Sequence, residues 1–395
     1  MKILCVIDSL GQGGAQRQLA ELAVGFREKG HQVSFLTYHH IPFFNEVVEK
    51  AGIPITCIEE KNYLLRLFRM RRFIRRGGYD AVLSFLERAS FICEFAGLPH
   101  RKWRLVAGER NAGAAVKRKP VMRFFLLFHL FADYVVANSA SNIRIIRSLN
   151  PLLPASRCRV IYNIVDFDRW KPAVNGTPHS EMGRNGSQDI RTSDDRPGDN
   201  GSPRNGSTHK RSPLRILVAA RVDHQKNLKG LTDALTLMDP EELEGIRIDW
   251  YGRMPEEEKM DPSTREALEA IRSNGLGKVV RFFPPAPDIE MQISQADAVG
   301  LFSFYEGFPN SIIEGMAMGK PAFCSAVSDV PDLLSHEPEL MFDPEDPKSI
   351  ATSLRHLLGM DPDRLARIGR ENERIARKWF HRETIIDEYL ELLGS

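Results

Sequence analysis

The sequence predicts an α/β protein with two Rossmann-like, doubly wound domains that face each other across a cleft. Three observations support this fold class. Strand and helix patterns alternate within each half of the chain, which is typical of parallel sheets covered by helices on both faces. A low-complexity segment separates the halves, and each half is long enough to bury its own core. The expected parts are an N-terminal domain over 1–173, an insert over 174–213 and a C-terminal domain over 214–395.

Each half begins its own series of strands and helices. In the first half, apolar runs predict strands at 2–7, 31–38, 79–85 and 132–139, and periodic apolar residues predict a helix over 15–28. The second half repeats the pattern, with strands expected at 214–221, 246–252, 279–283 and 296–304 and helices at 228–237 and 311–318. A long charged helix over 361–393 is expected to end the chain, and its last part, about 378–395, can cross back to the N-terminal domain.

The insert has a different composition from the rest of the chain. Residues 174–213 consist mainly of Asn, Gly, Ser, Pro, Arg and Asp. They cannot bury enough apolar surface to offset the entropy lost on ordering, so we expect disorder. The segment contains Asn-x-Ser/Thr sequons, but no secretory signal is visible, and we interpret the sequons as a by-product of composition.

Composition and charge narrow the class of protein. No run approaches the roughly 20 apolar residues of a membrane span, and the five cysteines show no metal-binding spacing, which predicts free buried thiols in a cytoplasmic protein. The net charge of +2 hides +11 in residues 1–150 and −12 in 214–395. The basic half indicates an anionic partner such as a phospholipid, a lipid pyrophosphate or nucleic acid. Alternatively, it complements the acidic half, and both interpretations stay open.

A glycine-rich turn follows the first strand. Gly11, Gly13 and Gly14 resemble part of a dinucleotide-binding fingerprint, but Gln16 replaces its third glycine and no acid follows the second strand. These departures disfavour NAD and a Rossmann oxidoreductase. We expect Gly13 and Gly14 to line the acceptor side of a cleft, with a purely structural turn as the alternative.

Two cations follow the first strand of the second domain. Arg221 and Lys226 lie just past 214–221, where the carboxyl end of a strand meets the ligand in a doubly wound sheet. Arginine offers a planar fork and lysine a point charge, and together they suit a diphosphate.

The most informative segment is 306–321. A strand pattern enters a Gly-Phe-Pro-Asn turn that opens a helix, an architecture that directs backbone N–H groups and a positive dipole end at an anion. Glu306 and Glu314 flank this turn. Carboxylates repel a phosphate but accept hydrogen bonds from sugar hydroxyls, so the segment indicates a nucleotide-sugar site.

Five segments in order, 13–23, 132–141, 159–166, 219–227 and 306–321, resemble the retaining GT-B glycosyltransferases of family 4, the group 1 type. The resemblance covers nearly the whole chain except 174–213, and 306–321 matches the family's Glu-x7-Glu pattern. It implies transfer of a hexose-type sugar from a nucleotide-diphosphate sugar to a glycan or lipid-linked acceptor, in cell-surface polysaccharide or glycolipid assembly. It also implies retention of anomeric configuration, no metal and no other cofactor.

The resemblance implies a role for each matched residue. Arg221 and Lys226 would bind the diphosphate and stabilise the departing nucleotide, and Glu306 would contact donor-sugar hydroxyls. Glu314 would accept hydrogen bonds from the ribose. The remaining donor-binding residues would be Ser303, Gly307, Phe308, Pro309, Asn310 and, near the base, Phe283.

Two positions depart from the family. Pro284 stands where a glycine often follows the base-binding strand, which leaves the base unidentified. On the acceptor side, where many members carry a histidine near the reacting centre, the chain has Glu109, Arg110 and Asn111, and one of these must take any such role.

Two basic segments of the first half are candidates for contact with an anionic membrane surface. Residues 64–76 carry six arginines among apolar residues, and 117–131 places three cations before a Phe/Leu-rich run. We favour an interface for 64–76 and a buried helix face for 124–132. The expected partners are therefore a nucleotide-sugar donor, a glycan or lipid-linked acceptor and the inner face of a membrane, with no nucleic acid. The remaining alternative is a catalytically silent binding protein of the same fold.

Overall fold

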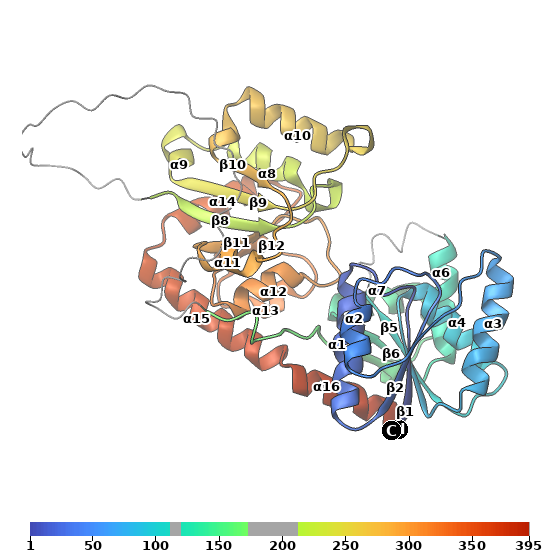
Figure 1. The fold of residues 1–395 in the computed structure, drawn as a ribbon. Helices are drawn as coiled ribbons and strands as arrows, with labels where there is room; N and C mark the ends of the chain where they lie inside the picture. Colours follow the sequence, from blue (N-terminus) through green and yellow to red (C-terminus); the bar gives the residue numbers. More distant parts are fainter. Residues whose placement is uncertain (111–119, 173–211, 395) are drawn as a thin grey trace, which may run out of the picture.

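The computed structural model describes residues 1–110, 120–172 and 212–394 and contains two parallel sheets with helices on both faces (Figure 1). The predicted two-domain, doubly wound fold class is confirmed. The predicted insert at 174–213 lies outside the described residues except for its last two positions. The predicted site residue Asn111 also lies outside them. Among the helices that the structure describes, none combines the length and apolar character needed to cross a membrane.

The N-terminal sheet has the strand order β3-β2-β1-β4-β5-β6-β7, with every pair parallel. Its strands are β1 (Lys2–Val6), β2 (Gln32–Thr37), β3 (Ile55–Cys57), β4 (Ala81–Phe85), β5 (Arg104–Glu109), β6 (Tyr134–Ala137) and β7 (Cys158–Val160). Its helices are α1 (Gly14–Glu28), α2 (Asn45–Lys50), α3 (Tyr63–Arg76), α4 (Glu87–Gly97), α6 (Pro120–Leu127) and α7 (Ala140–Leu149). Alternate β1 residues enter two cores: Ile3 and Cys5 pack towards α1, and Leu4 and Val6 towards α3 and α4.

The C-terminal sheet has the order β10-β9-β8-β11-β12-β13, also parallel. Its strands are β8 (Leu214–Ala219), β9 (Ile246–Tyr251), β10 (Val280–Phe283), β11 (Ala298–Leu301), β12 (Ala322–Ser325) and β13 (Met341–Phe342). Its helices are α8 (Leu228–Leu235), α9 (Pro240–Glu244), α10 (Pro262–Ser273), α11 (Ile289–Ser294), α12 (Asn310–Ala317), α13 (Val330–Leu333), α14 (Pro347–Leu358) and α15 (Pro362–Trp379). The strand order reverses between β8 and β11, and this switch point is where ligands bind in such sheets.

The prediction of a single long helix over 361–393 is wrong, because two helices occupy this part of the chain. After α15, Phe380 turns fully into the core and His381 forms an isolated bridge with Val165, which interrupts the helix. The second helix, α16 (Arg382–Gly394), crosses to the first domain (Figure 1). There it buries residues such as Tyr389 against α1 and the N-terminal sheet.

One prediction about the cysteines is also wrong in part. Cys5, Cys93 and Cys324 are free and buried as expected, but Cys57 is exposed and Cys158 is half-buried. Both exceptions lie on β3 and β7, the two edge strands of the N-terminal sheet, where neighbouring elements cover less of each strand.

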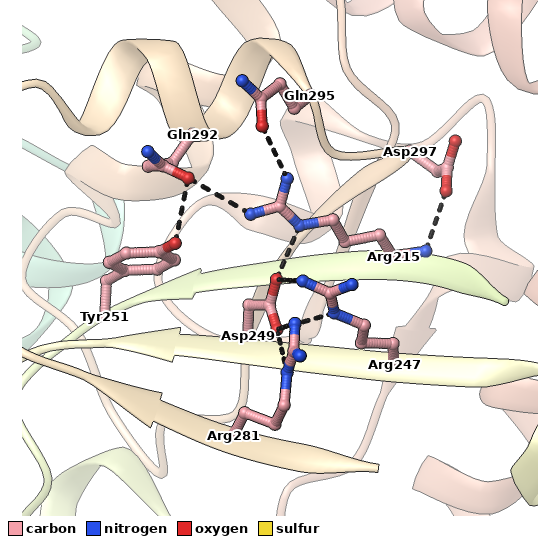
Figure 2. A network of polar contacts seen from close by, with 8 residues as sticks. All are labelled: Arg215, Arg247, Asp249, Tyr251, Arg281, Gln292, Gln295 and Asp297. Atoms are coloured by element: carbon pink, nitrogen blue, oxygen red, sulfur yellow. Dashed lines mark hydrogen bonds and ion pairs between the residues drawn. The ribbon is translucent and has the colours of Figure 1, made fainter. Parts of the chain in front are cut away.

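A charged network ties three strands of the C-terminal sheet together (Figure 2). Asp249 on β9 is fully buried and accepts hydrogen bonds from the guanidinium groups of Arg215 on β8 and Arg281 on β10, and from Arg247 on its own strand. The distances lie between 2.6 Å (Arg215) and 3.1 Å (Arg281). One carboxylate therefore neutralises part of the charge of three arginines, on the sheet face opposite the core formed by Ile248 and Trp250.

Replacing Asp249 with alanine should lower the free energy of unfolding by about 3 kcal/mol, because three guanidinium groups would lose their shared counter-charge. Urea unfolding measures this as a lower midpoint at unchanged slope. The matched control is Asp233→Ala, which breaks an exposed i,i+4 pair with Lys229 and should change stability by less than about 0.5 kcal/mol. Equal effects of the two variants would contradict the structural role of Asp249.

Candidate active site

A cleft with a volume of about 750 Å³ lies between the two domains. It is located at the carboxyl ends of the strands in both sheets, as the switch-point rule requires. Both domains contribute to its walls. The first domain supplies Gly14, Ala15, Gln16, Leu86, Glu87, Arg110, Met122, Asn138 and Asn163, and the second supplies Ala220, Arg221, Gln225, Lys226, Tyr305, Glu306, Gly307, Phe308 and Asn310.

Lys226 and Glu306 face each other in the second domain. Lys226 ends a 3-10 turn (His224–Lys226) that follows β8, and Glu306 follows β11, the neighbouring strand across the switch point. The Lys226 Nζ lies 2.5 Å from Glu306 Oε1, and the same oxygen accepts a hydrogen bond of 2.6 Å from the Ser303 hydroxyl. Ser303 is completely buried and therefore orients Glu306 from behind.

Arg221 is available to a ligand. Its side chain is 67% exposed and lies 3.3 Å from Asp223, a weak pairing at the rim of the cleft. The Asp223 carboxylate also accepts the Lys226 backbone N–H, which holds the turn carrying Lys226. Two cations thus border the same part of the cleft: Lys226 is held in place by Glu306, whereas Arg221 is exposed and only weakly paired.

The start of α12 forms the adjoining wall. Pro309 precedes the helix, and Gly307, Phe308 and Asn310 line the cleft, so the positive end of the helix borders it. The Phe308 ring is buried and packs 5.7 Å from Tyr162 and 5.6 Å from Phe380, measured between ring centroids. This packing holds the turn against the segment that joins the domains.

Arg110 links the first domain to α12. Its buried guanidinium donates to the Asn163 side-chain oxygen at 2.9 Å and to the Tyr389 hydroxyl on α16, and it lies 4.1 Å from the Phe85 ring centroid. Asn163 in turn donates to the Asn310 side-chain oxygen at 2.8 Å. A chain of polar contacts therefore runs from the terminal helix to the first residue of α12.

Glu109 does not line the cleft, contrary to its predicted place beside Arg110. Strand alternation turns its carboxylate to the other face of the sheet, where it lies 3.3 Å from His129 Nε2. His129 is completely buried, and its Nδ1 lies 2.7 Å from Glu94. Burial raises the pKa of Glu109, which favours its neutral form; burial also opposes ionisation of His129, but Glu94 and Glu109 raise its pKa overall.

Several other predicted residues lie near the cleft without lining it in the described structure. Gly13 precedes α1 in extended backbone, and a Cβ there would meet only the end of the flexible Gln16 side chain, so these contacts do not require glycine at this position. Phe283 stacks on Tyr251 with ring centroids 4.7 Å apart, and the Arg281 guanidinium lies over its ring. Ser303, Pro309 and Glu314 do not line the cleft either. Glu314 instead pairs with Arg17 of the first domain at 2.7 Å.

Sequence reasoning missed several polar residues of the cleft. Asn138 and Asn163 lie within two of the five segments that carry the family resemblance, so their position in those motifs was an available signal. Gln225 lies beside Lys226 and donates to the Tyr305 carbonyl at 2.9 Å. No sequence pattern predicted that Glu87 lines the cleft. Glu87 follows Leu86, whose backbone φ of 77° is strained for a leucine, and this strain is visible only in the folded chain.

The two domains also meet beside the cleft. Asp329, almost fully buried, accepts hydrogen bonds from the backbone N–H groups of Ala140 (2.6 Å) and Ser141 (2.9 Å) at the start of α7. A carboxylate of the second domain therefore caps a helix of the first, where the helix dipole favours negative charge. Asn142 reaches across to the Gly307 carbonyl at 3.4 Å, in the turn that follows Glu306.

Comparison with known proteins agrees with this geometry. Residues 12–169 match the family model described as Glycosyltransferase Family 4, and residues 213–360 match the one described as Glycosyl transferases group 1. The two matches fall on the two domains and together include nearly all of the cleft residues.

Individual relatives are distant. The chain is 23% identical over 328 residues to a Campylobacter jejuni GalNAc-α-(1→4)-GalNAc-α-(1→3)-diNAcBac-PP-undecaprenol α-1,4-N-acetyl-D-galactosaminyltransferase, covering 80% of this chain and 77% of the relative. It is 24% identical to the Rhizomucor pusillus α-1,3/1,6-mannosyltransferase ALG2 over 200 residues, covering 44% and 43%. Anabaena Alr3699/HepE, solved in complex with UDP, has the same fold with a TM-score of 0.77 and 19% identity over the full length of both chains. The chain therefore belongs to the family 4, group 1 glycosyltransferases with the GT-B fold.

Proposed function

We propose that this glycosyltransferase moves a hexose-type sugar from a nucleoside-diphosphate sugar to a glycan or lipid-linked acceptor, with retention of anomeric configuration and without a metal ion. The pairing of Lys226 with Glu306 across the switch point carries the proposal. It places a cation suited to a phosphate beside a carboxylate suited to sugar hydroxyls, so a sugar phosphate could contact both at once.

The cations and the start of α12 would receive the diphosphate. Lys226 has three N–H donors, so it can keep Glu306 and bind a phosphate oxygen at once. Arg221, exposed at the rim, would add a second positive charge. As the bond between the anomeric carbon and the phosphate oxygen breaks, negative charge grows on the phosphate, and groups already fixed in place stabilise it without reorganisation.

The sugar would then lie against Glu306 and the polar wall of the first domain. In the retaining reaction, the acceptor oxygen bonds to the anomeric carbon on the face that the phosphate leaves, and the acceptor's proton passes to the departing phosphate oxygen. This route needs no side-chain nucleophile. Glu306 is already engaged by Lys226 and Ser303, which supports a hydroxyl-binding role for it.

The acceptor would be linked to a lipid at an anionic membrane surface. The name of the Campylobacter jejuni relative gives an acceptor joined through PP to undecaprenol. The first domain of this chain exposes apolar side chains on α3 and α6, on the side away from α1 and α16 (Figure 1). The two groups are connected, because Phe68, Phe95, Phe91 and Phe124 follow one another with ring centroids 5.8 to 6.4 Å apart.

The geometry of α3 supports an oriented contact with a membrane. Its first turns expose Leu64, Leu65 and Phe68, and its last turns expose Arg72 and Arg76. Because a crossover helix begins at the carboxyl ends of the strands, the apolar end of α3 lies at the same edge of the sheet as the cleft. Apolar residues would enter the bilayer while the arginines contact the headgroups, so the cleft would face the lipid-linked acceptor.

Not all six arginines of this segment are free for lipids. Arg71 and Arg75 donate to carbonyls at the end of α4, Arg69 pairs with Glu60, and Arg66 lies over the Tyr38 ring. The expected buried face at 124–132 is also only partly correct, because Phe125 and Leu126 are buried whereas Phe124 and Leu127 are exposed. The surface that we propose is therefore smaller than the two segments of the sequence.

Lys226→Ala should lower the rate of sugar transfer about 10²- to 10³-fold, because a fixed charge beside the departing phosphate is lost. Release of nucleoside diphosphate from the donor measures the rate. Lys229→Ala is the matched control, since Lys229 lies one turn away and pairs with Asp233 outside the cleft. Full activity of a folded Lys226→Ala protein would contradict the proposal.

Chelation of metal ions should leave the rate of transfer unchanged within about twofold, because Arg221, Lys226 and the start of α12 would supply the positive charge that a metal would otherwise supply. The measurement compares rates in EDTA with those in added Mg²⁺ or Mn²⁺. A loss of activity in EDTA that either ion restores would refute metal independence.

Binding to vesicles should depend on both parts of the α3–α6 surface. Phe68→Ser with Phe124→Ser, or Arg72→Glu with Arg76→Glu, should weaken binding to vesicles of phosphatidylglycerol and phosphatidylcholine by at least about tenfold. Sedimentation with the vesicles measures this, and phosphatidylcholine alone should bind poorly. Leu237→Ser, an exposed apolar residue of the other domain, is the control. Equal binding by all variants would exclude this surface.

A further inference from the structure

An ion pair between the domains involves Glu314, the carboxylate for which the family resemblance implies contact with the ribose of the donor. Arg17, in the first turns of α1, places Nη2 2.7 Å from Oε1 of Glu314 on α12. The starts of the two helices are in contact here, because a Cβ on Gly14 would lie 3.4 Å from the Asn310 amide. Neither Arg17 nor Glu314 lines the described cleft.

Glu314 lies in a place where a carboxylate needs a partner. Its side chain is only 14% exposed, and its neighbours Ile313 and Gly315 are buried. Burial raises the pKa of Glu314, and the charge and hydrogen bond of Arg17 oppose that effect. The charge of Arg169 also lowers this pKa, and the charge of Glu290 raises it. Glu314 is four residues after Asn310, so both lie on the same face of α12, and Asn310 borders the cleft.

Arg17 is committed to this contact. Its Nε–H is buried without a hydrogen-bond acceptor among the described residues, and the next carboxylate, Glu21, lies 3.9 Å away. The guanidinium therefore directs its close contact at a single oxygen of Glu314. The second oxygen, Oε2, is not engaged by Arg17.

We propose that Arg17 is a positioning residue for nucleotide recognition: by holding Oε1 of Glu314, it keeps the carboxylate ionised and turned so that Oε2 accepts hydrogen bonds from the ribose hydroxyls. This inference rests on the proposed function, because it needs a nucleoside-diphosphate donor whose ribose contacts Glu314 as the family resemblance implies. It adds that the first domain contributes to binding of the nucleotide, so the donor would be bound well only while the two domains are in contact.

The test compares nucleotides with and without a ribose hydroxyl. Calorimetry with UDP, GDP and ADP first identifies the nucleoside diphosphate that binds, and its 2′-deoxy form is then the matched probe. The wild type should prefer the ribonucleotide. Arg17→Gln should weaken ribonucleotide binding about tenfold and the deoxy form much less, and Arg17→Lys should restore part of the preference.

The pH dependence of binding separates positioning from a merely structural role. Without Arg17, the pKa of Glu314 rises further, so the carboxyl takes up its proton at higher pH. Affinity for the ribonucleotide should therefore fall with decreasing pH, with a midpoint at higher pH in Arg17→Gln than in the wild type. Glu314→Gln cannot titrate, so it should remove this dependence and the preference for ribose, and adding Arg17→Gln to it should change little.

Lys29→Gln is the control, because Lys29 is also on α1 and pairs with Asp387 of α16, away from Glu314. Folding of every variant is checked by circular dichroism and thermal unfolding. If Arg17→Gln keeps the ribose preference, or weakens both nucleotides equally at every pH, the positioning role is overturned. If the wild type binds none of the three nucleotides, the proposed function itself fails, which is a distinct result.

Discussion

Opposite charge across the domain interface holds the two halves of this enzyme around one cleft. Arg17 of the first domain pairs with Glu314 of the second, and Asp329 of the second caps α7 of the first. Lys29 on α1 likewise pairs with Asp387 on α16. The first two contacts are largely shielded from water, unlike the exposed Lys29–Asp387 pair, so they are screened less than surface pairs and fix the geometry of the walls. The excess of positive charge in 1–150 and of negative charge in 214–395 is therefore partly used within the molecule itself.

The remaining positive charge faces outward. Arg72 and Arg76 are exposed on α3, and neither side chain forms a hydrogen bond or ion pair with another described residue. The two interpretations of the basic half, internal complementarity and an anionic partner, thus apply to different surfaces of the same domain. The first concerns α1 and α7, which meet the second domain, and the second concerns the exposed residues of α3 and α6.

The terminal helix has two functions in the architecture. Tyr389 of α16 completes the core of the first domain, and its hydroxyl accepts a hydrogen bond from Arg110. Through Asn163, Arg110 is connected to Asn310 at the start of α12. Tyr389 in α16 therefore helps to orient a turn that lies some 80 positions earlier in the sequence. In this way the terminal helix contributes to the geometry of the cleft without lining it.

The residues that sequence alone determined are those whose role follows from local structure. Alternating strand and helix patterns specify a parallel sheet, and a cation after β8 or a Glu after β11 must lie at the carboxyl edge, where ligands bind. Lys226, Arg221, Glu306 and the start of α12 were predictable for that reason. Contacts between distant segments were not. Only the tertiary structure brought His129 to Glu109, separated α15 from α16 at Phe380, and brought Arg17 to Glu314, because these outcomes depend on packing between elements that no local pattern encodes.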